Sequence, residues 1–536
     1  MAEAIHANLA QTRIAPDLHE LMAAPAEAVS GVPQPTEVII ELNAHFPGGV
    51  RAARDILIEA YLTSRTVPQA RRDAALIGVV PPPVPILLPP HSPRAWILTA
   101  AGAPFDFDAE DEVFIWKSLQ TEAYIFARLA AATIMALADL TARSPDGSSE
   151  QAPIHKLWSD HVVQTLVYES VRTIKGDAAR AAFGSGGLGI VWAIADTGID
   201  GGHPHFQTHG SLKLPGGLRH CDFTAAFDDP NASEAAALTD TDGHGSHVAG
   251  IIAGACYRAD SPAAKPDLPT VDAITISHTV RTGDNQTDSV IEADRIEVSG
   301  IAPLCKLLSL KVLQSGQSGT VSNLLAAIGY IQQTNNFGRD IKIHGLNLSL
   351  GYPFDAAWFA AGQSPLCAEV DRLVKCGVSV VAAAGNAGYG RVSAVGGASA
   401  TAALPCTIAD PGNAELAVTV GSTHRNRPHV FGVSYFSAKG PTADGRDKPD
   451  LVAPGERIVS CQAGAGRAAY KEDSGTSMAA PHVSAAIAAF LSVRAEFIGR
   501  PEDVKAILVG SAIDLKRRPE FQGAGLIDLM KALQSV

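Results

Sequence analysis

The stretch GIVWAIADTGID, residues 189–200, decides how the larger part of the chain folds. It is an unbroken apolar run that ends in Asp196, with Gly198 where the chain has to turn. Apolar runs of the same kind recur downstream, between helical or glycine-rich segments, at 306–313, 343–350 and 378–385. Apolar strands that alternate with helices are typical of a parallel sheet covered on both faces. A carboxylate at the end of such a strand lies at the edge where parallel sheets place their sites.

A second motif, DGHGSHVAG at 242–250, combines small residues with two histidines. The small residues let a helix pack closely against its neighbours, with His244 near the N-terminal end of that helix. His244 and His247 could together hold a metal ion, but the HExxH pattern of zinc peptidases is missing. We therefore expect His244 to act as a base.

A third motif, SGTSMAAPHV at 474–483, opens a long apolar helix. Pro481 would break a helix interior but is tolerated in a first turn, where N–H groups have no intrahelical partner. We therefore expect Ser477 to stand at a helix N-terminus, where free N–H groups and the helix dipole favour negative charge.

The order of the three motifs matters as much as their content, because Asp196, His244 and Ser477 follow one another as in one known arrangement of a serine-peptidase triad. IADTGID, DGHGSHVAG and SGTSMAAPHV closely resemble the three catalytic signatures of the subtilases, a family of serine endopeptidases. The likeness continues in LKVLQSGQSGT (310–320), NLSLG (347–351), VVAAAGN (380–386) and FSAKGPTADGRDKPDLVAPG (436–455). It covers about residues 185–530.

The resemblance implies a role for each catalytic residue. A serine hydroxyl is a poor nucleophile at neutral pH and needs an adjacent base, which His244 would supply. Asp196 would fix the imidazole tautomer and stabilise the imidazolium. The resemblance assigns the oxyanion donors to the Asn386 side-chain amide and the Ser477 backbone N–H. Loss of one such donor costs roughly 3–4 kcal/mol in the transition state.

The resemblance also implies how a peptide substrate lies, as a strand added to the edges of the site. One edge strand would span 316–319 and include Gly316, Ser318 and Gly319. A second edge strand would consist of Ser349, Leu350 and Gly351. With Ala384 and Gly385, this second strand would wall the pocket for the residue before the cut. The small side chains favour broad specificity with a preference for large apolar residues.

The N-terminal third differs from the rest of the chain in its pattern of expected strands and helices. Strands are expected at 37–43, 122–129 and 154–163, and helices at 50–61 and 130–140. The Pro-rich run at 81–93 is expected to be a stiff, extended connector. The part from residue 122 resembles the second half of a subtilase propeptide, a ferredoxin-like α+β fold that chaperones and inhibits the protease. The segment HVVQTLVYESV resembles the junction between propeptide and enzyme, so autocleavage is expected just after Tyr168.

These observations divide the chain into an extension at 1–34, a propeptide-like domain at 35–168 and a peptidase domain at 169–536. The expected fold class is α/β, a three-layer sandwich with a mostly parallel central sheet, preceded by a small α+β domain that acts as an intramolecular inhibitor. An insertion at about 255–299 departs from the family pattern and is polar and rich in Asp and Thr. It could be a lid, a partner surface or a tolerated surface excursion.

Composition narrows the class of partner. The formal net charge is −13 and no long Lys or Arg run occurs, so protein or peptide substrates are expected and nucleic acid is not. The sequence contains no apolar stretch of roughly 18 residues or more, so no membrane-spanning helix is expected. The N-terminal residues lack the basic start and apolar core of a secretory signal. We therefore expect a cytoplasmic location, or export by a route without a recognisable signal peptide.

The remaining signals point away from disulfides and cofactors. The seven cysteines are odd in number and form no CxxC pair, which indicates buried or free thiols. GSGGLG at 184–189 matches the glycine pattern of a dinucleotide loop but precedes a strand instead of following one, which favours a simple turn. The chemistry itself requires no cofactor. Calcium often stabilises subtilases, but no recognisable loop assigns ligands here.

Two other functions stay open. A catalytically silent binding or regulatory protein could keep the same scaffold, although the complete set of Asp196, His244, Ser477 and Asn386 argues against it. A non-peptidase acyl hydrolase would use the same triad. A panel of peptide and ester substrates separates that alternative from an endopeptidase.

Overall fold

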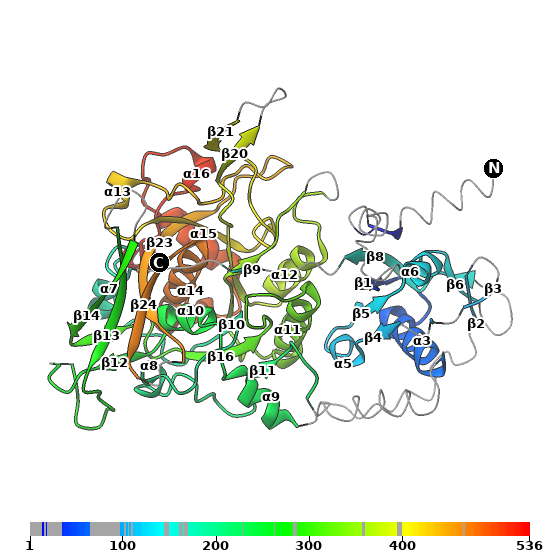
Figure 1. Ribbon diagram of the computed structural model, residues 1–536, viewed down its shortest axis with the longest axis horizontal. Coiled ribbons are helices and arrows are strands. Elements are labelled where there is room, and N and C mark those ends of the chain that lie inside the picture. Colours follow the sequence, from blue (N-terminus) through cyan, green and yellow to red (C-terminus); the bar gives the residue numbers. More distant parts are fainter. Residues whose placement is uncertain are drawn as a thin grey trace.

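The structure, a computed structural model, describes residues 13–15, 18, 35–64, 97–100, 103–105, 107–108, 111–143, 150–159, 164–165, 170–227, 229–261, 263–281, 287–355, 360–393, 399–464 and 467–536. Within these ranges the chain builds one large sheet flanked by helices, and its N-terminal part forms smaller sheets of its own (Figure 1). The Pro-rich run at 81–93 and Tyr168 lie outside the described residues.

Among the described residues, the large sheet has ten strands. In spatial order they are β11 (Cys221–Asp222), β16 (Lys306–Lys311), β10 (Val191–Asp196), β17 (Gly345–Leu348), β19 (Ser379–Ala383), β22 (Val418–His424), β23 (Leu451–Cys461), β24 (Ala469–Ser474), β13 (Ile274–Arg281) and β14 (Thr287–Arg295). The strands from β11 to β23 pair in parallel, whereas β24 runs antiparallel to β23. The expectation of a mostly parallel sheet is confirmed.

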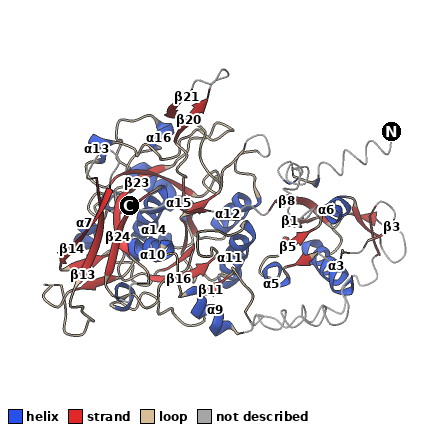
Figure 2. Cartoon of the chain, viewed as in Figure 1, coloured by secondary structure: helices blue, strands red, loops and turns tan. Residues whose placement is uncertain are grey.

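Helices cover both faces of this sheet (Figure 2). The helices on one face are α10 (His244–Ile252), α14 (Thr476–Val493), α15 (Pro501–Ser511) and α17 (Leu529–Gln534), and those on the other are α11 (Val321–Thr334) and α12 (Pro365–Lys375). Strand β10 shows why both faces are covered: Trp192 and Ile194 point into the first layer, and Val191 and Ala193 into the second. Alternation of side chains along an all-apolar strand thus creates two cores and three layers.

Helix α14 lies at the centre of the first layer (Figure 1). By length and hydropathy it is the one helix among the described residues that could span a membrane, but 89% of its apolar window is buried inside the protein. Burial on all sides is the pattern of a core helix.

The insertion forms regular structure. A short pair, β12 (Ala255–Tyr257) and β15 (Glu297–Ser299), closes its base. Between them, β13 and β14 form a hairpin, and β13 pairs in parallel with β24. The insertion therefore extends the large sheet by two strands. The sequence alone indicated a polar excursion and gave no sign of sheet extension.

The N-terminal part has its own core. Its main sheet has the order β4 (Glu112–Val113), β5 (Tyr124–Leu129), β1 (Thr36–Leu42), β8 (Ile154–Ser159), with all neighbours antiparallel. The helices in the described ranges of this part are α3 (Gly49–Ser64), α5 (Ile115–Ser118) and α6 (Ala131–Ala138). A second small sheet, which the sequence did not suggest, has the order β3 (Ala103–Pro104), β2 (Ile97–Ala100), β6 (Leu140–Arg143), β7 (Glu150–Gln151). The strand expected at 154–163 has its described part in β8, which ends at Ser159.

Short elements complete the chain. They are β9 (Gln164–Thr165), α7 (Gly176–Phe183), α8 (Pro204–Gln207), α9 (Pro230–Ala237), β18 (Leu350–Gly351), β20 (Tyr389–Ser393), β21 (Ser399–Ala403), α13 (Pro428–Phe431) and α16 (Pro519–Gln522), with 3₁₀ turns at Asn336–Gly338 and Ala495–Phe497. The GSGGLG stretch is a turn before β10, as expected, with positive φ at Gly184, Gly187 and Gly189. All seven cysteines are free thiols, also as expected.

Candidate active site

Asp196 is the last residue of β10, and its side chain meets His244 at the start of α10. The Asp196 Oδ1 atom lies 2.7 Å from His244 Nδ1 and accepts a second hydrogen bond from the Thr197 N–H at 2.8 Å. Both side chains are buried. Burial raises the pKa of the Asp196 carboxyl, and the neighbouring His244 ring opposes this rise. A buried carboxylate on Nδ1 holds the imidazole in one orientation and stabilises its protonated form.

Asp240 connects the strand end to the helix start, a role that the sequence analysis missed. Its carboxylate accepts hydrogen bonds from Thr197 Oγ1 at 3.0 Å, the Gly243 N–H at 2.8 Å and Ser246 Oγ at 2.7 Å. Thr197 Oγ1 in turn accepts the Gly245 N–H at 2.9 Å. The Asp196–His244 geometry is therefore held by a second carboxylate. The only sequence signal was an Asp within the run TDTDGHG.

Gly245 shows how closely the two elements approach. A Cβ atom at this position would lie 2.1 Å from the Gly198 carbonyl oxygen and 3.1 Å from Asp196 Cβ. A side chain at residue 245 would therefore push α10 away from the end of β10. The glycine next to the histidine is required by this contact.

Ser477 is the second residue of α14, at the N-terminal end that the sequence predicted. Its Oγ atom is buried and has no hydrogen-bond partner among the residues that the structure describes. Its backbone N–H lies in the first turn, where α-helices leave N–H groups without an intrahelical acceptor. The hydroxyl and this N–H are thus both placed for a group that binds from outside the helix.

The expected position of Pro481 in the first turn is wrong. Pro481 is the sixth residue of α14 and so lacks the N–H that would bond to the carbonyl of residue 477. The Ser349 hydroxyl supplies the missing donor, at 2.6 Å from the Ser477 oxygen. The helix tolerates the proline because the side chain of Ser349, which lies between β17 and β18, replaces the lost bond.

Asn386 follows β19 and is oriented by Thr476, the residue before Ser477. Its Oδ1 atom accepts hydrogen bonds from the N–H and the hydroxyl of Thr476, both at 3.0 Å. The Gly385 N–H donates to Thr476 Oγ1 at 3.1 Å. Because the amide oxygen faces Thr476, the amide NH₂ group faces the opposite way. The structure thus brings Asn386 to the start of the helix that carries Ser477.

The two expected substrate strands differ in outcome. Leu350 and Gly351 form β18 next to Ser349, and β18 pairs antiparallel with β9, Leu350 with Thr165 and Gly351 with Gln164. The stretch 316–319, by contrast, is not an edge strand. Positive φ angles at Gly316 and Gln317 fold it into a turn, in which the Gln314 N–H donates to the Ser318 oxygen and Gly319 forms an isolated bridge with Leu313.

The remaining predicted residues lie beside the site. Ala384 and Gly385 are buried at the end of β19, and the Ala409 N–H donates to the Ala384 oxygen at 2.9 Å. His247, one turn after His244, has Nε2 at 3.4 Å from the Lys471 oxygen, and burial holds its pKa well below the usual range. The two histidines therefore face different partners. Among the described residues, no group of three or more His, Cys, Asp or Glu side chains is placed to hold a metal ion.

Comparison with known proteins gives a consistent result. The profile of the subtilase family matches residues 187–525. Serine protease AprX of Bacillus subtilis is 26% identical over 397 residues, 71% of this chain and 74% of that protein. Subtilisin DY of Bacillus licheniformis is 29% identical over 61% of this chain and 85% of its own length. The major intracellular serine protease of Bacillus subtilis is 29% identical over 67% of this chain and 87% of its own length.

Proposed function

Since the chain belongs to the subtilase family and is a serine endopeptidase, we propose that Asp196, His244 and Ser477 are its catalytic triad. The observation that carries the proposal is the buried 2.7 Å contact between Asp196 and His244 on a helix that packs against the helix of Ser477. Ser477 Oγ attacks the carbonyl carbon of the scissile peptide bond while His244 takes the hydroxyl proton. His244 then gives this proton to the leaving amine, and water releases the acyl group by the same steps in reverse.

The oxyanion that forms during attack needs donors that are already in place. The Asn386 NH₂ group and the Ser477 N–H supply them in this proposal, because Thr476 turns the Asn386 oxygen away and the first turn of α14 leaves the Ser477 N–H without an intrahelical acceptor. Donors fixed before the reaction do not have to reorganise as charge develops, which is why such holes lower the barrier.

The triad is tested with Ser477→Ala and His244→Ala. Each should reduce peptide hydrolysis by more than tenfold, by about the same factor, because triad members act as a unit. A fluorophosphonate probe should label the wild-type protein and not Ser477→Ala. A protein that hydrolyses esters but no peptide would favour the acyl-hydrolase alternative, and a chain that never labels would favour the silent scaffold.

Specificity follows from the walls of the cleft. Peptide pairs with β18 in this proposal, and the small residues Ala384 and Gly385 border the pocket for the side chain before the cut. A pocket with such walls accepts large apolar side chains. Cleavage-site sequencing on a denatured protein of mixed composition should therefore show Leu, Met, Phe or Tyr enriched at that position.

We propose further that the N-terminal domain inhibits the protease domain. The strand order β4-β5-β1-β8, with all neighbours antiparallel, supports the ferredoxin-like assignment. Ile39, Tyr124 and Phe126 of its sheet share a core with residues of α11 and α12. The pairing of β9 with β18 puts the segment that leads toward Tyr168 on the strand proposed to bind substrate.

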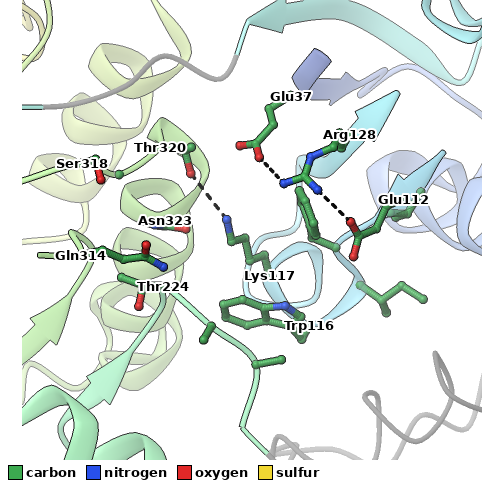
Figure 3. A pocket seen from close by; sticks show the side chains of 16 residues that line it. Glu37, Glu112, Trp116, Lys117, Arg128, Thr224, Gln314, Ser318, Thr320 and Asn323 are labelled. Atoms are coloured by element: carbon green, nitrogen blue, oxygen red, sulfur yellow. Dashed lines mark hydrogen bonds and ion pairs between the residues drawn. The ribbon is translucent and has the colours of Figure 1, made fainter. Parts of the chain in front are cut away.

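Polar contacts join the two domains beside this core. From α5, Lys117 Nζ donates to Ser322 Oγ at 3.1 Å, at the start of α11, and Figure 3 shows the same side chain directed at Thr320. The Gln333 side chain donates to the Gln120 oxygen at 2.6 Å. A cavity of about 670 Å³ remains between α5 and the turn at 314–320. The polar contacts between the two domains thus reach α11, and the cavity lies beside the turn at 314–320.

The inhibitor proposal is tested with two separate proteins, residues 1–168 and residues 169–536. The second should be more active per folded molecule than the full-length chain before cleavage, and the first should inhibit it when added. Folded fraction is measured independently, because the truncated protein can refold poorly. A well-folded enzyme that the separate domain leaves uninhibited at micromolar concentration would show that the domain has another role.

A further inference from the structure

Lys439 places a charged group in an unusual position near the proposed oxyanion donor. Its side chain is buried, with 4% of the residue exposed, and its ammonium group donates to three backbone oxygens. The acceptors are Gly388 at 2.7 Å, Ser437 at 2.9 Å and Tyr435 at 3.0 Å. The ammonium also lies 5.3 Å from the centre of the Phe521 ring. Burial lowers the pKa of Lys439. A buried charge is costly unless several groups coordinate it, and here three carbonyl oxygens do so.

One of these bonds, to the Gly388 oxygen, ends on the segment that carries Asn386. Gly388 is two residues after Asn386, and its N–H donates to the Phe436 oxygen at 2.9 Å. A Cβ atom at residue 388 would lie 1.8 Å from the Ser437 oxygen and 2.5 Å from Lys439 Nζ. The backbone therefore approaches the lysine so closely that only glycine fits.

A hairpin begins at the next residue, and the Leu404 N–H that follows it donates to the same Gly388 oxygen at 2.9 Å. Strands β20 and β21 project from the body of the protein (Figure 1). Movement of this hairpin about its base would carry the backbone of Gly388, and with it Asn386. Lys439 binds the chain between the hairpin and Asn386, and it binds the facing segment 435–437 at the same time.

We infer that Lys439 is a positioning residue for peptide hydrolysis: it holds the Gly388 carbonyl against the segment 435–437 and so fixes the Asn386 amide at the oxyanion. The inference rests on the proposed function of Asn386. Lys439 touches neither substrate nor reacting atoms and acts through the backbone. A displacement of about 1 Å in a catalytic group can cost about a hundredfold in rate, so a fastener of this kind has a measurable effect.

Lys448 provides a matched control. It is equally buried, at 2% exposed, and its ammonium also has three oxygen acceptors: Asp450 Oδ2 at 2.7 Å, Thr419 Oγ1 at 2.8 Å and the Ala417 oxygen at 3.0 Å. These acceptors lie at the N-terminal ends of β22 and β23, whereas Asp196 lies at the C-terminal end of its parallel strand. Loss of Lys448 should therefore affect stability without moving Asn386.

The experiment measures kcat and KM on a peptide substrate for full-length proteins, with each concentration fixed by end-point labelling with a fluorophosphonate. Lys439→Met should lower kcat ~10- to 100-fold with KM within about twofold, whereas Lys448→Met should keep kcat within about twofold and lower the melting temperature. Asn386→Ala should lower kcat roughly 100- to 1000-fold. In the Asn386→Ala background, Lys439→Met should have less than about a twofold further effect, because the group that it positions is gone.

Three results are decisive. Unchanged kcat in Lys439→Met, or an effect that multiplies fully with that of Asn386→Ala, overturns the inference and leaves the triad untouched. If Asn386→Ala itself has normal kcat, the oxyanion assignment fails instead. Should Lys439→Met not fold, Lys439→Gln, which keeps two N–H donors, carries the same cycle, and it should show a smaller loss of kcat with the same dependence on Asn386.

Discussion

At the scale of single residues, one side chain of the site makes a hydrogen bond in place of one that the main chain cannot make. Pro481 removes a donor from α14, and Ser349 restores a bond to the Ser477 oxygen. The bond joins the segment proposed to bind substrate to the helix that carries Ser477. One hydroxyl therefore serves helix stability and the relative placement of two parts of the site.

This arrangement predicts a rescue. In a Ser477→Ala background, which prevents self-digestion, Ser349→Ala should lower the free energy of unfolding by about 1–3 kcal/mol, because it leaves the buried Ser477 carbonyl without a donor and the Asn347 amide without this acceptor. Adding Pro481→Ala should recover the part of this loss that comes from the carbonyl, since alanine supplies the missing N–H. Chemical denaturation measures both values. Equal destabilisation in the single and the double variant would show that the Ser349 bond is not the source of the effect.

The places of single residues could be predicted from the sequence where a short motif fixes both the residue type and its position in a helix or strand. The apolar run before Asp196 and the small residues around His244 and Ser477 placed these side chains on a strand end and two helix starts, and the structure has them there. Asp240, Thr476 and Lys439 were missed because their roles depend on atoms from distant segments. Lys439, for example, bonds to Gly388 across 51 positions of sequence.

At the scale of elements, helix α11 meets the N-terminal domain through a glycine. A Cβ atom at Gly329 would lie 2.1 Å from the Gln120 oxygen, and the neighbouring Gln333 side chain donates to that same oxygen. Glycine is a poor residue for a helix interior, so its presence here favours docking at the expense of helix stability. The interface explains a residue that the helix alone would not select.

Gly329→Ala should therefore separate docking from folding. In the protein of residues 169–536 it should leave kcat unchanged and stabilise the fold by up to about 1 kcal/mol. Inhibition by added residues 1–168 should weaken at least tenfold, because the extra methyl displaces the Gln120 backbone. Gly510→Ala, in a helix where an added Cβ meets no atom within 4 Å, is the control and should leave inhibition unchanged. Equal inhibition of both variants would exclude docking as placed here.

Elements whose partners are distant were also the ones that sequence could not predict. The strand at 189–196 can be predicted because its apolar pattern lies within one short segment. The hairpin β13–β14 cannot be predicted in this way, because its residues are polar and it joins the large sheet only by pairing with β24, almost two hundred residues later. The family resemblance implies a strand at 316–319, but the positive φ at Gln317, which the sequence does not record directly, makes this stretch a turn.

At the scale of the whole molecule, buried histidines set the response to acid. Burial lowers the pKa of His205 to about 3 and of His482 to about 4, and it also lowers the pKa values of His203, His220 and His344. Both ring nitrogens of His205 and His482 are engaged, with Tyr470 and Gly250 in one case and Met478 and Ser170 in the other. The folded protein therefore resists protonation of these rings.

The sign of the pH dependence follows. The unfolded chain takes up these protons near pH 6.5 and the folded chain only near pH 3 to 4, so stability present above pH 6.5 is lost as the pH falls through that window. Each such histidine contributes ~1.4 kcal/mol per pH unit to the slope of the unfolding free energy. Denaturation of Ser477→Ala between pH 7 and 4 measures the slope. His482→Gln should reduce it by about one proton, and a flat profile would contradict the prediction.

The pairing of β9 with β18 has a consequence for the amount of inhibitor relative to enzyme. Because the segment proposed to inhibit and the cleft that it would cover belong to one polypeptide, the ratio of inhibitor to enzyme would be one to one at any level of synthesis. A separate inhibitor is lost on dilution, whereas a tethered one sees the same local concentration in a crowded compartment and in a dilute one. Latency of this kind responds to scission or to distortion of the chain and ignores how many copies are present.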